Sequence, residues 1–481
     1  MHGCGVRMRA SRGTARALDI LPARMSRLPT IVVIGGGFSG TAVAAHLLRR
    51  GRPARVVLVN RFGPMGRGVA YGTSLEAHRL NVPAGAMSAL PDDPDHFVRW
   101  ARARHDAIRP ESFVSRRLYG EYLESLLREA EHQAPRAARL ERLVGVARDV
   151  EPRPGGGAEV VFAGARLEAD RVVLALGNYS PANPPAVGAE FYDTNRYVRD
   201  PWVRGSLDVV RPGESVLLVG TGLTMMDIAL DLAARDVRLP LFAVSRHGLV
   251  PRAHAGRSPR TDAAALPPDL DGPPRTVARY VRAIRRHARA HARAGGDWRD
   301  VVAALRARTP ELWSSLTQAE RARFLRHVRP WWDVHRHRAP PETASAVEKM
   351  LVSGDLSVRA ARILGYRPVA GEVEVMLRPR GASEPVRIHV QRVVNATGPS
   401  TDVRRIGDPL LDALLARDVL RPDPLGLGLE TASDLALLDA EGKPSRSLYL
   451  MGPLLKAGYW EATAVPELRA HAARLAERLL P

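Results

Sequence analysis

The sequence predicts an α/β fold with two Rossmann-like dinucleotide-binding domains and a helical insert. Two observations predict it. A short apolar run followed by a glycine-rich turn and a helical stretch occurs twice, and each of these units is followed later by a strand that ends in glycine. With 481 residues, the chain is also longer than one hydrophobic core usually organises. We therefore expect two domains, each with its own nucleotide site.

The first unit begins directly after Pro29. The β-branched run 31–34 predicts a buried strand, and Gly35-Gly36-Gly37-Phe38-Ser39-Gly40, which follows it, fits the pattern G-x-G-x-x-G. In such a turn Gly35 permits the tight bend, Gly37 lets the backbone approach a pyrophosphate, and Gly40 allows close packing of helix and strand. The helix predicted at 41–50 begins next to Phe38 and Ser39, and its N-terminus offers free N–H groups to phosphates.

The second strand of this unit, predicted at 56–59, ends at Asn60. An acidic residue usually binds the ribose at this place, and an amide can still hydrogen-bond a 2′-hydroxyl. The neighbouring Arg61 resembles a phosphate-binding residue of an NADP site. Residue chemistry alone therefore leaves open which cofactor the first unit holds.

The second unit follows the same order. The apolar run 216–219 precedes Gly220-Thr221-Gly222-Leu223-Thr224-Met225, and a helix is predicted to continue to about Ala234. Met225 replaces the third glycine, which puts the closest helix–strand packing in doubt. The next strand, 241–244, ends at Ser245-Arg246, a pair that can hydrogen-bond and neutralise a 2′-phosphate. This favours NADPH over NADH, the alternative being that Arg246 only caps the strand.

Two later strands, 171–176 and 392–397, end at Gly177 and Gly398, and each follows a stretch of alternating β character. This order resembles the flavoproteins with two dinucleotide-binding domains of the glutathione-reductase type. The resemblance implies a discontinuous FAD domain (29–205 and 400–481), an inserted NAD(P)H domain (206–399) and a disordered leader (1–28). It also implies that the first glycine turn holds FAD and the second NADPH.

Several runs resemble a narrower family more closely: 66–73, 80–84, 91–94, 326–332 and 452–461. That family is a large bacterial one of FAD/NAD(P)-binding proteins, most of them uncharacterised in function, related to flavin-dependent N-hydroxylating monooxygenases. The resemblance implies that Arg67 and Asn81 lie near the flavin. Gly452-Pro453 stands where a Gly-Asp pair usually contacts the ribityl chain, so that carboxylate contact is missing. The last helix, expected from about Thr463 to Leu480, would point its N-terminus at the flavin.

Between about 273 and 345 the sequence predicts an amphipathic helical insert on the NAD(P)H domain, with helices at 278–294, 298–308 and 318–328. Its four tryptophans are interpreted as core anchors: Trp298, Trp313, Trp331 and Trp332. A metal site at Asp333, His335 and His337 is not expected, because arginines alternate with the histidines and would repel a cation.

Composition excludes several classes of function. The net charge is +20, but only three of the 71 basic residues are lysines, so the charge reflects an arginine-rich composition and we expect no nucleic-acid partner. The single cysteine, Cys4, excludes an intramolecular dithiol and hence a dithiol-type disulfide reductase. No run is long and apolar enough to cross a membrane, and the leader has no secretory pattern, so a cytoplasmic protein is expected, with Met25 an alternative start to Met1.

Together these features predict an FAD-dependent, NADPH-oxidising oxidoreductase. The family resemblance favours a monooxygenase that acts on a small nitrogen-containing or other soft nucleophilic substrate through a flavin C4a-hydroperoxide. One alternative is a dehydrogenase or reductase that passes electrons to a quinone or a protein acceptor. Another is a flavin-binding redox sensor or scaffold with slow turnover. No catalytic side chain is singled out.

Overall fold

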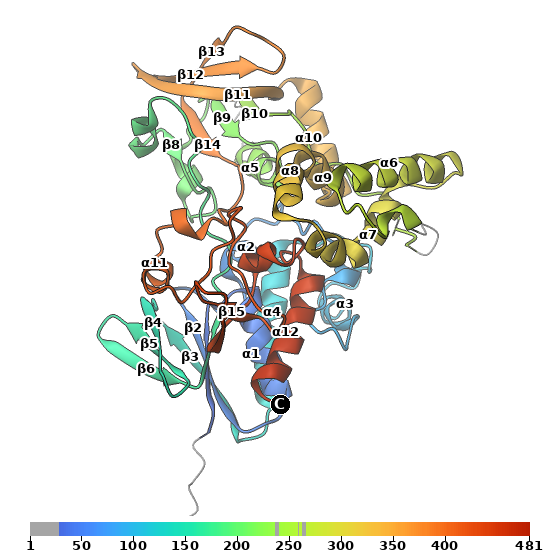
Figure 1. Ribbon diagram of the computed structural model, residues 1–481. Coiled ribbons are helices and arrows are strands. Elements are labelled where there is room, and N and C mark those ends of the chain that lie inside the picture. The colour runs from blue at the N-terminus through green and yellow to red at the C-terminus, as the bar shows by residue number, and fades with distance from the viewer. Residues whose placement is uncertain (1–27, 236–239, 258, 262–265) are drawn as a thin grey trace, which may run out of the picture.

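The computed structural model describes residues 28–235, 240–257, 259–261 and 266–481 (Figure 1). Residues 1–27 of the predicted leader, which include Cys4 and Met25, lie outside the described residues. Two large sheets, each built mainly of parallel strands, form the centres of two domains, and a group of helices extends to one side. The first sheet belongs to the lower half of the view in Figure 1 and the second to the upper half.

The first sheet has six strands in the order β15-β16-β7-β1-β2-β3. Its strands are β1 (Thr30–Ile34), β2 (Ala54–Asn60), β3 (Ala138–Val144), β7 (Arg171–Leu174), β15 (Ala436–Leu438) and β16 (Pro444–Leu450). All neighbours pair in parallel except β15 with β16. The C-terminal strands β15 and β16 complete a sheet begun by the N-terminal segment, so this sheet joins two segments that are distant in sequence.

Helices cover this sheet because its strands are buried and apolar. Helix α1 (Phe38–Arg49) contacts both α4 (Arg116–Gln133) and α12 (Val465–Leu479), and the three helices lie side by side in Figure 1. The shorter helices around this domain are α2 (Gly68–Tyr71), α3 (His96–Arg102) and α11 (Pro409–Ala416). A separate three-stranded meander is formed by β4 (Asp149–Pro152), β5 (Ala158–Phe162) and β6 (Ala165–Ala169).

The second sheet has seven strands in the order β13-β12-β11-β10-β9-β14-β8. Its strands are β8 (Tyr197–Val198), β9 (Val216–Val219), β10 (Leu241–Ser245), β11 (Leu356–Val369), β12 (Glu372–Pro379), β13 (Val386–Val390) and β14 (Arg392–Asn395). Helices α5 (Leu223–Ala234) and α10 (Pro341–Ser353) contact each other beside it. Because β8 pairs with β14, the predicted first-domain segment 29–205 contributes a strand to the second sheet.

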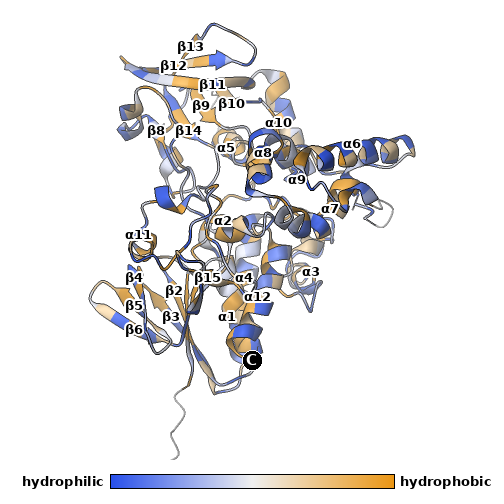
Figure 2. Cartoon of the chain, in the orientation of Figure 1, coloured by the Kyte–Doolittle hydropathy of each residue, from blue (hydrophilic) through white to orange (hydrophobic). Residues whose placement is uncertain are grey.

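The helical insert consists of α6 (Val277–Arg293), α7 (Trp298–Ser314), α8 (Gln318–His327) and α9 (Arg329–Arg336). Helix α6 extends away from the body, and hydrophilic and hydrophobic residues alternate along it in Figure 2. The sequence predicts that this insert belongs to the NAD(P)H domain, and its contacts in the structure extend further. Its apolar core also includes Leu427, Ala457 and Trp460 of the C-terminal segment, so the insert bridges to the first domain.

Of the four tryptophans interpreted as core anchors, Trp313 is buried in this core, 4.7 Å from the ring of Trp460, whereas Trp331 is exposed. Short 3₁₀ helices connect other elements: Ala84–Ala86, Ala189–Asp193, Ser206–Val209, Pro268–Leu270, Val403–Arg405 and Pro453–Ala457. Within the described part of the chain, no helix combines the length and apolar content that crossing a membrane requires. The cytoplasmic location stays a prediction.

Candidate active site

The first glycine turn has the geometry that its sequence predicts. Gly35 follows β1 with φ at +121°, a conformation that favours glycine, and a Cβ on Gly40 would overlap the carbonyl of Gly35. Gly37 is the N-cap of α1, and no described side chain caps the helix there. A Cβ on Gly37 would meet only the Cα of Gly68, at 3.6 Å. The turn therefore presents open backbone at a helix N-terminus, which suits a phosphate group.

The segment around Arg67 lies directly against this turn. The N–H of Gly66 donates to the carbonyl of Gly36 at 2.7 Å, and a Cβ on Gly68 would come within 2.9 Å of the Cα of Gly37. The guanidinium of Arg67 itself donates to Glu124 on α4 at 2.6 Å. Arg67 thus lies beside the first turn with its charge already paired, and its predicted place near the flavin stays a prediction.

Asn60 and Arg61 are fixed by contacts of their own. The amide of Asn60 donates to the carbonyls of Phe62 and Gly63 at 2.7 and 3.2 Å, so it shapes the loop that follows β2. Arg61 forms an ion pair with Asp408, a buried residue that also caps α11. Because this carboxylate neutralises Arg61, the geometry does not favour a 2′-phosphate at the first turn.

Ser39 on α1 and Gly452 after β16 come together beside the first turn, since a Cβ on Gly452 would lie 3.0 Å from the hydroxyl of Ser39. Phe38 is buried beside Tyr119 of α4. Gly177 and Gly398 follow β7 and β14 with φ near +73° and +86°, and a Cβ on either would meet no atom within 4 Å. Ser39 and Gly452 therefore lie together beside the first turn, whereas Gly398 follows a strand of the second sheet.

The second glycine turn is similar in form. Gly220 follows β9 with φ at +115°, and a Cβ on it would come within 2.6 Å of the carbonyl of Ala396. A Cβ on Gly222, the N-cap of α5, would meet no described atom within 4 Å, and Leu223 and Thr224 form the first turn of the helix. Met225 is fully buried in the second core, so the side chain that replaces the third glycine is accommodated by packing.

Of the predicted pair Ser245-Arg246, only Arg246 is available to donate hydrogen bonds to a ligand. Thr221 donates to the carbonyl of Leu249, so the Ser245 hydroxyl donates to the Thr221 oxygen at 2.8 Å, and it accepts the N–H of Gly248 at 3.0 Å. Its one proton is therefore used inside the protein. Arg246 is exposed and has no ion-pair or hydrogen-bond partner among the described residues.

A second arginine, Arg380, follows β12 and lies beside the residue next to Arg246. Arg380 donates to Nδ1 of His247 at 2.9 Å, next in sequence to Arg246. Burial, Arg380 and Arg246 together lower the pKa of His247, which marks the positive potential around it. No motif connected Arg380 with this site, because Arg380 lies far from Arg246 along the chain.

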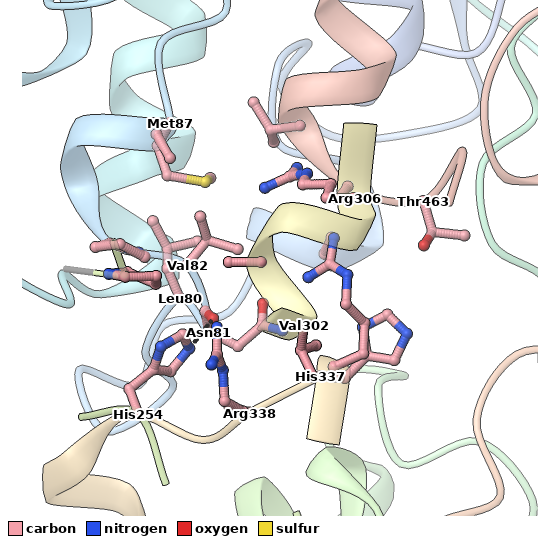
Figure 3. A pocket seen from close by; sticks show the side chains of 18 of the residues that line it. Leu80, Asn81, Val82, Met87, His254, Val302, Arg306, His337, Arg338 and Thr463 are labelled. Carbon is pink, nitrogen blue, oxygen red and sulfur yellow. Dashed lines mark hydrogen bonds between the residues drawn. The ribbon is translucent and has the colours of Figure 1, made fainter. Parts of the chain in front are cut away.

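A cavity of about 390 Å³ lies where the first domain meets the helical insert (Figure 3). Its walls come from the loop 80–87, from α7 and from residues 336–338 at the C-terminal end of α9. Thr463, Ala464 and Val465, at the start of α12, close another side. The predicted residues Asn81 and Thr463 are thus brought to one cavity, and no described side chain caps the N-terminus of α12 there.

Comparisons with known proteins agree with this geometry. Residues 32–179 match the model of a protein family described as FAD-NAD(P)-binding. The first glycine turn belongs to an FAD-NAD(P)-binding domain. A comparison with curated protein sequences gave no match.

Among solved structures, an ornithine N-hydroxylase from Kutzneria sp. 744 is 16% identical, with a TM-score of 0.61 over 94% of this chain and 99% of that chain. A cadaverine monooxygenase from Erwinia amylovora, bound to FAD, is 13% identical, with a TM-score of 0.65 over 94% and 95%. A bacillithiol disulfide reductase from Staphylococcus aureus is 12% identical, with a TM-score of 0.54 over 94% and 98%. These similarities confirm the predicted two-domain flavoprotein fold.

Sequence reasoning missed three features around the FAD-NAD(P)-binding domain. His254 and Arg338 line the cavity but come from distant segments, and α7 forms a wall that was interpreted only as part of the insert. Nε2 of His254 donates to the backbone carbonyl of Asn81 at 3.0 Å. Burial, followed by the nearby Arg338, lowers the pKa of His254 to about 4, so the ring is neutral at neutral pH.

His254 makes folding sensitive to acid. Its pKa in the folded chain is about 4, below the ordinary value of 6.5, so between these values the unfolded chain binds more protons. The contribution of His254 to the free energy of unfolding is thus complete above about pH 6.5 and is lost as the pH falls toward 4. In urea unfolding at pH 7 and pH 5, the variant His254→Gln should lose less stability than the wild type. Equal losses in both proteins would contradict this.

Proposed function

We propose that the protein is an FAD-dependent, NADPH-oxidising monooxygenase that acts on a small nitrogen-containing or other soft nucleophilic substrate. The observation that carries this proposal is the cavity at the N-terminus of α12, which opens between the FAD-NAD(P)-binding domain and the insert. A helix N-terminus stabilises negative charge that develops near it, and reduction of a flavin creates such charge.

The residues present fit both cofactors. FAD would be held at the first turn by the open backbone at Gly37, by the N-terminus of α1 and by Asn60, with Ser39 and Gly452 beside them. NADPH would be held at the second turn, where a Cβ on Gly222 would occupy empty space, with Arg246 and Arg380 near the 2′-phosphate. When bound and reduced by NADPH, FAD supplies the oxygen chemistry that side chains lack.

The chain's own side chains would then bind and orient the substrate and would exclude water. Leu80, Val82 and Met87 give the cavity an apolar wall, which limits the access of water. His254 fixes the backbone of Asn81 at the cavity edge. The insert completes the enclosure, since Arg306 of α7 pairs with Glu467 in the first turn of α12 at 2.6 Å.

Cysteine usage separates this proposal from the reductases of the same fold. The disulfide reductase among the structural neighbours acts on a disulfide, whereas this chain has one cysteine and can form no internal dithiol. The hydroxylase and the monooxygenase among the neighbours are named for ornithine and for cadaverine, which both carry primary amines. Ornithine carries a carboxylate as well and cadaverine does not, so these two neighbours leave open whether the substrate here does.

An isotope experiment tests the proposal. The FAD-loaded protein is mixed with NADPH and ¹⁸O₂ in the presence of amino acids, diamines and sulfides, and products are analysed by mass spectrometry. We expect one substrate to gain a single ¹⁸O atom for each NADPH consumed. Hydrogen peroxide as the sole product with every candidate would contradict the proposal. Fast anaerobic reoxidation of the flavin by a quinone would favour a reductase in its place.

A further inference from the structure

Arg338 is a buried cation without a partner among the residues that the structure describes. Its side chain lines the cavity, and the residue is 6% exposed. Neither Nε nor Nη1 of Arg338 has a hydrogen-bond partner among the described residues. No carboxylate of the described residues lies within ion-pair distance of Arg338. A buried guanidinium is normally paired, because removing its charge from water is costly.

The backbone holds Arg338 in a defined place. Residues 253 and 339 form a parallel β-bridge, in which the N–H of His254 donates to the carbonyl of Ala339 at 3.0 Å and the N–H of Ala339 donates to the carbonyl of Arg252 at 2.9 Å. The side chains of Arg338 and His254 consequently lie next to each other beside the loop that carries Asn81 (Figure 3). The backbone position of Arg338 is therefore set by this pairing.

The other arginines of the cavity are neutralised. Arg116 pairs with Asp227 at 2.6 Å, Arg306 with Glu467 at 2.6 Å and Arg336 with Glu461 at 3.1 Å. Burial, together with Arg336 and Arg299, lowers the pKa of Arg338 to about 10, so it remains charged at neutral pH. The uncompensated positive charge of this cavity is therefore at Arg338.

We propose that Arg338 forms an oxyanion-binding subsite that receives the carboxylate of the substrate in this cavity. This rests on the proposed function and narrows it: the substrate carries a carboxylate besides the nucleophilic atom, as an amino acid does and a simple diamine does not. A carboxylate can accept two parallel hydrogen bonds from a guanidinium, which gives both affinity and orientation. Arg338 is then the residue that sets specificity for that group.

The test uses acetate as the carboxylate probe and the FAD-loaded full chain. The Tm is measured with increasing sodium acetate and with sodium chloride at equal ionic strength, for the wild type, Arg338→Met and Arg306→Gln. We expect acetate to raise the Tm of the wild type and of Arg306→Gln above the chloride reference, and to have no such effect on Arg338→Met. Without acetate, Arg338→Met should be at least as stable as the wild type, because it removes an unpaired buried charge.

Two results would overturn the proposal. A lower Tm of Arg338→Met without ligand would show that Arg338 is a structural residue, and an equal acetate response in both proteins would show that it binds no carboxylate. The other source of an oxyanion is the nicotinamide cofactor. If Arg338→Met weakens NADP⁺ binding about tenfold in a direct titration, the subsite serves the cofactor phosphates and the assignment to the substrate is wrong. These binding measurements need no turnover, so a failure of the proposed monooxygenase reaction would be seen separately.

Discussion

Gly222→Val is expected to keep FAD bound and to slow flavin reduction by NADPH by roughly 100-fold, because the valine side chain would fill the space of the cofactor phosphates and remove their backbone hydrogen bonds. A Cβ at Gly222 meets no atom of the described residues within 4 Å, so the substitution should not disturb folding. Anaerobic stopped-flow absorbance of the flavin band measures the reduction rate, and the ratio of flavin to protein absorbance measures the bound FAD.

Gly37→Val is the matched variant at the first turn, and we expect it to have the opposite effect on FAD binding. It has one neighbour for its Cβ, the Cα of Gly68 at 3.6 Å, so it should fold but purify without FAD. Gly40→Ala is a different kind of control, because its Cβ would overlap the carbonyl of Gly35 and should destabilise the domain itself. Loss of FAD in Gly222→Val with retention in Gly37→Val would reverse the assignment of the two cofactors.

Arg246→Glu is expected to raise the Kd of NADPH by roughly 100-fold and to leave that of NADH nearly unchanged. A charge-assisted hydrogen bond to the 2′-phosphate would be lost and replaced by repulsion, and only NADPH carries that phosphate. The variant should fold normally, because Arg246 is exposed and makes no hydrogen bond or ion pair with described residues. Equilibrium titration of the FAD-loaded protein with each oxidised cofactor measures the effect.

Two control variants sharpen this prediction. Arg380→Ala should weaken NADPH binding in the same direction but less, because it removes one of two cations beside His247. Ser245→Ala should change the preference little, since its proton is already donated to Thr221. Equal weakening of NADH and NADPH by Arg246→Glu would contradict a role in binding the 2′-phosphate.

The features that the sequence predicted well are local ones. A strand, a glycine turn and a helix N-terminus are contiguous in the chain, so the residues that form each turn, such as Gly35 and Gly40, can be identified by spacing alone. The returning strands β7 and β14 were also identified, because each is a short apolar run that ends in glycine. The two-domain fold follows from the repetition of these local units.

The features that were missed depend on contacts between distant segments. Arg338 meets His254 only because residues 253 and 339 pair, and nothing near Arg338 in the sequence indicates that bridge. The internal hydrogen bond of Ser245 depends on Thr221, and the paired state of Arg61 depends on Asp408. Charge and hydrogen-bond availability at a site are properties of the folded surroundings, so residue type at a motif position could not predict them.

The measurement that tests the central claim most directly is anaerobic mixing of the FAD-loaded wild type with NADPH and, separately, with NADH. If the two turns hold FAD and NADPH as proposed, NADPH should bleach the flavin band rapidly and NADH much more slowly, and the bleached protein should recover its absorbance on admission of oxygen. Absence of bleaching with either nicotinamide would contradict hydride transfer between the two sites and favour a redox sensor or scaffold.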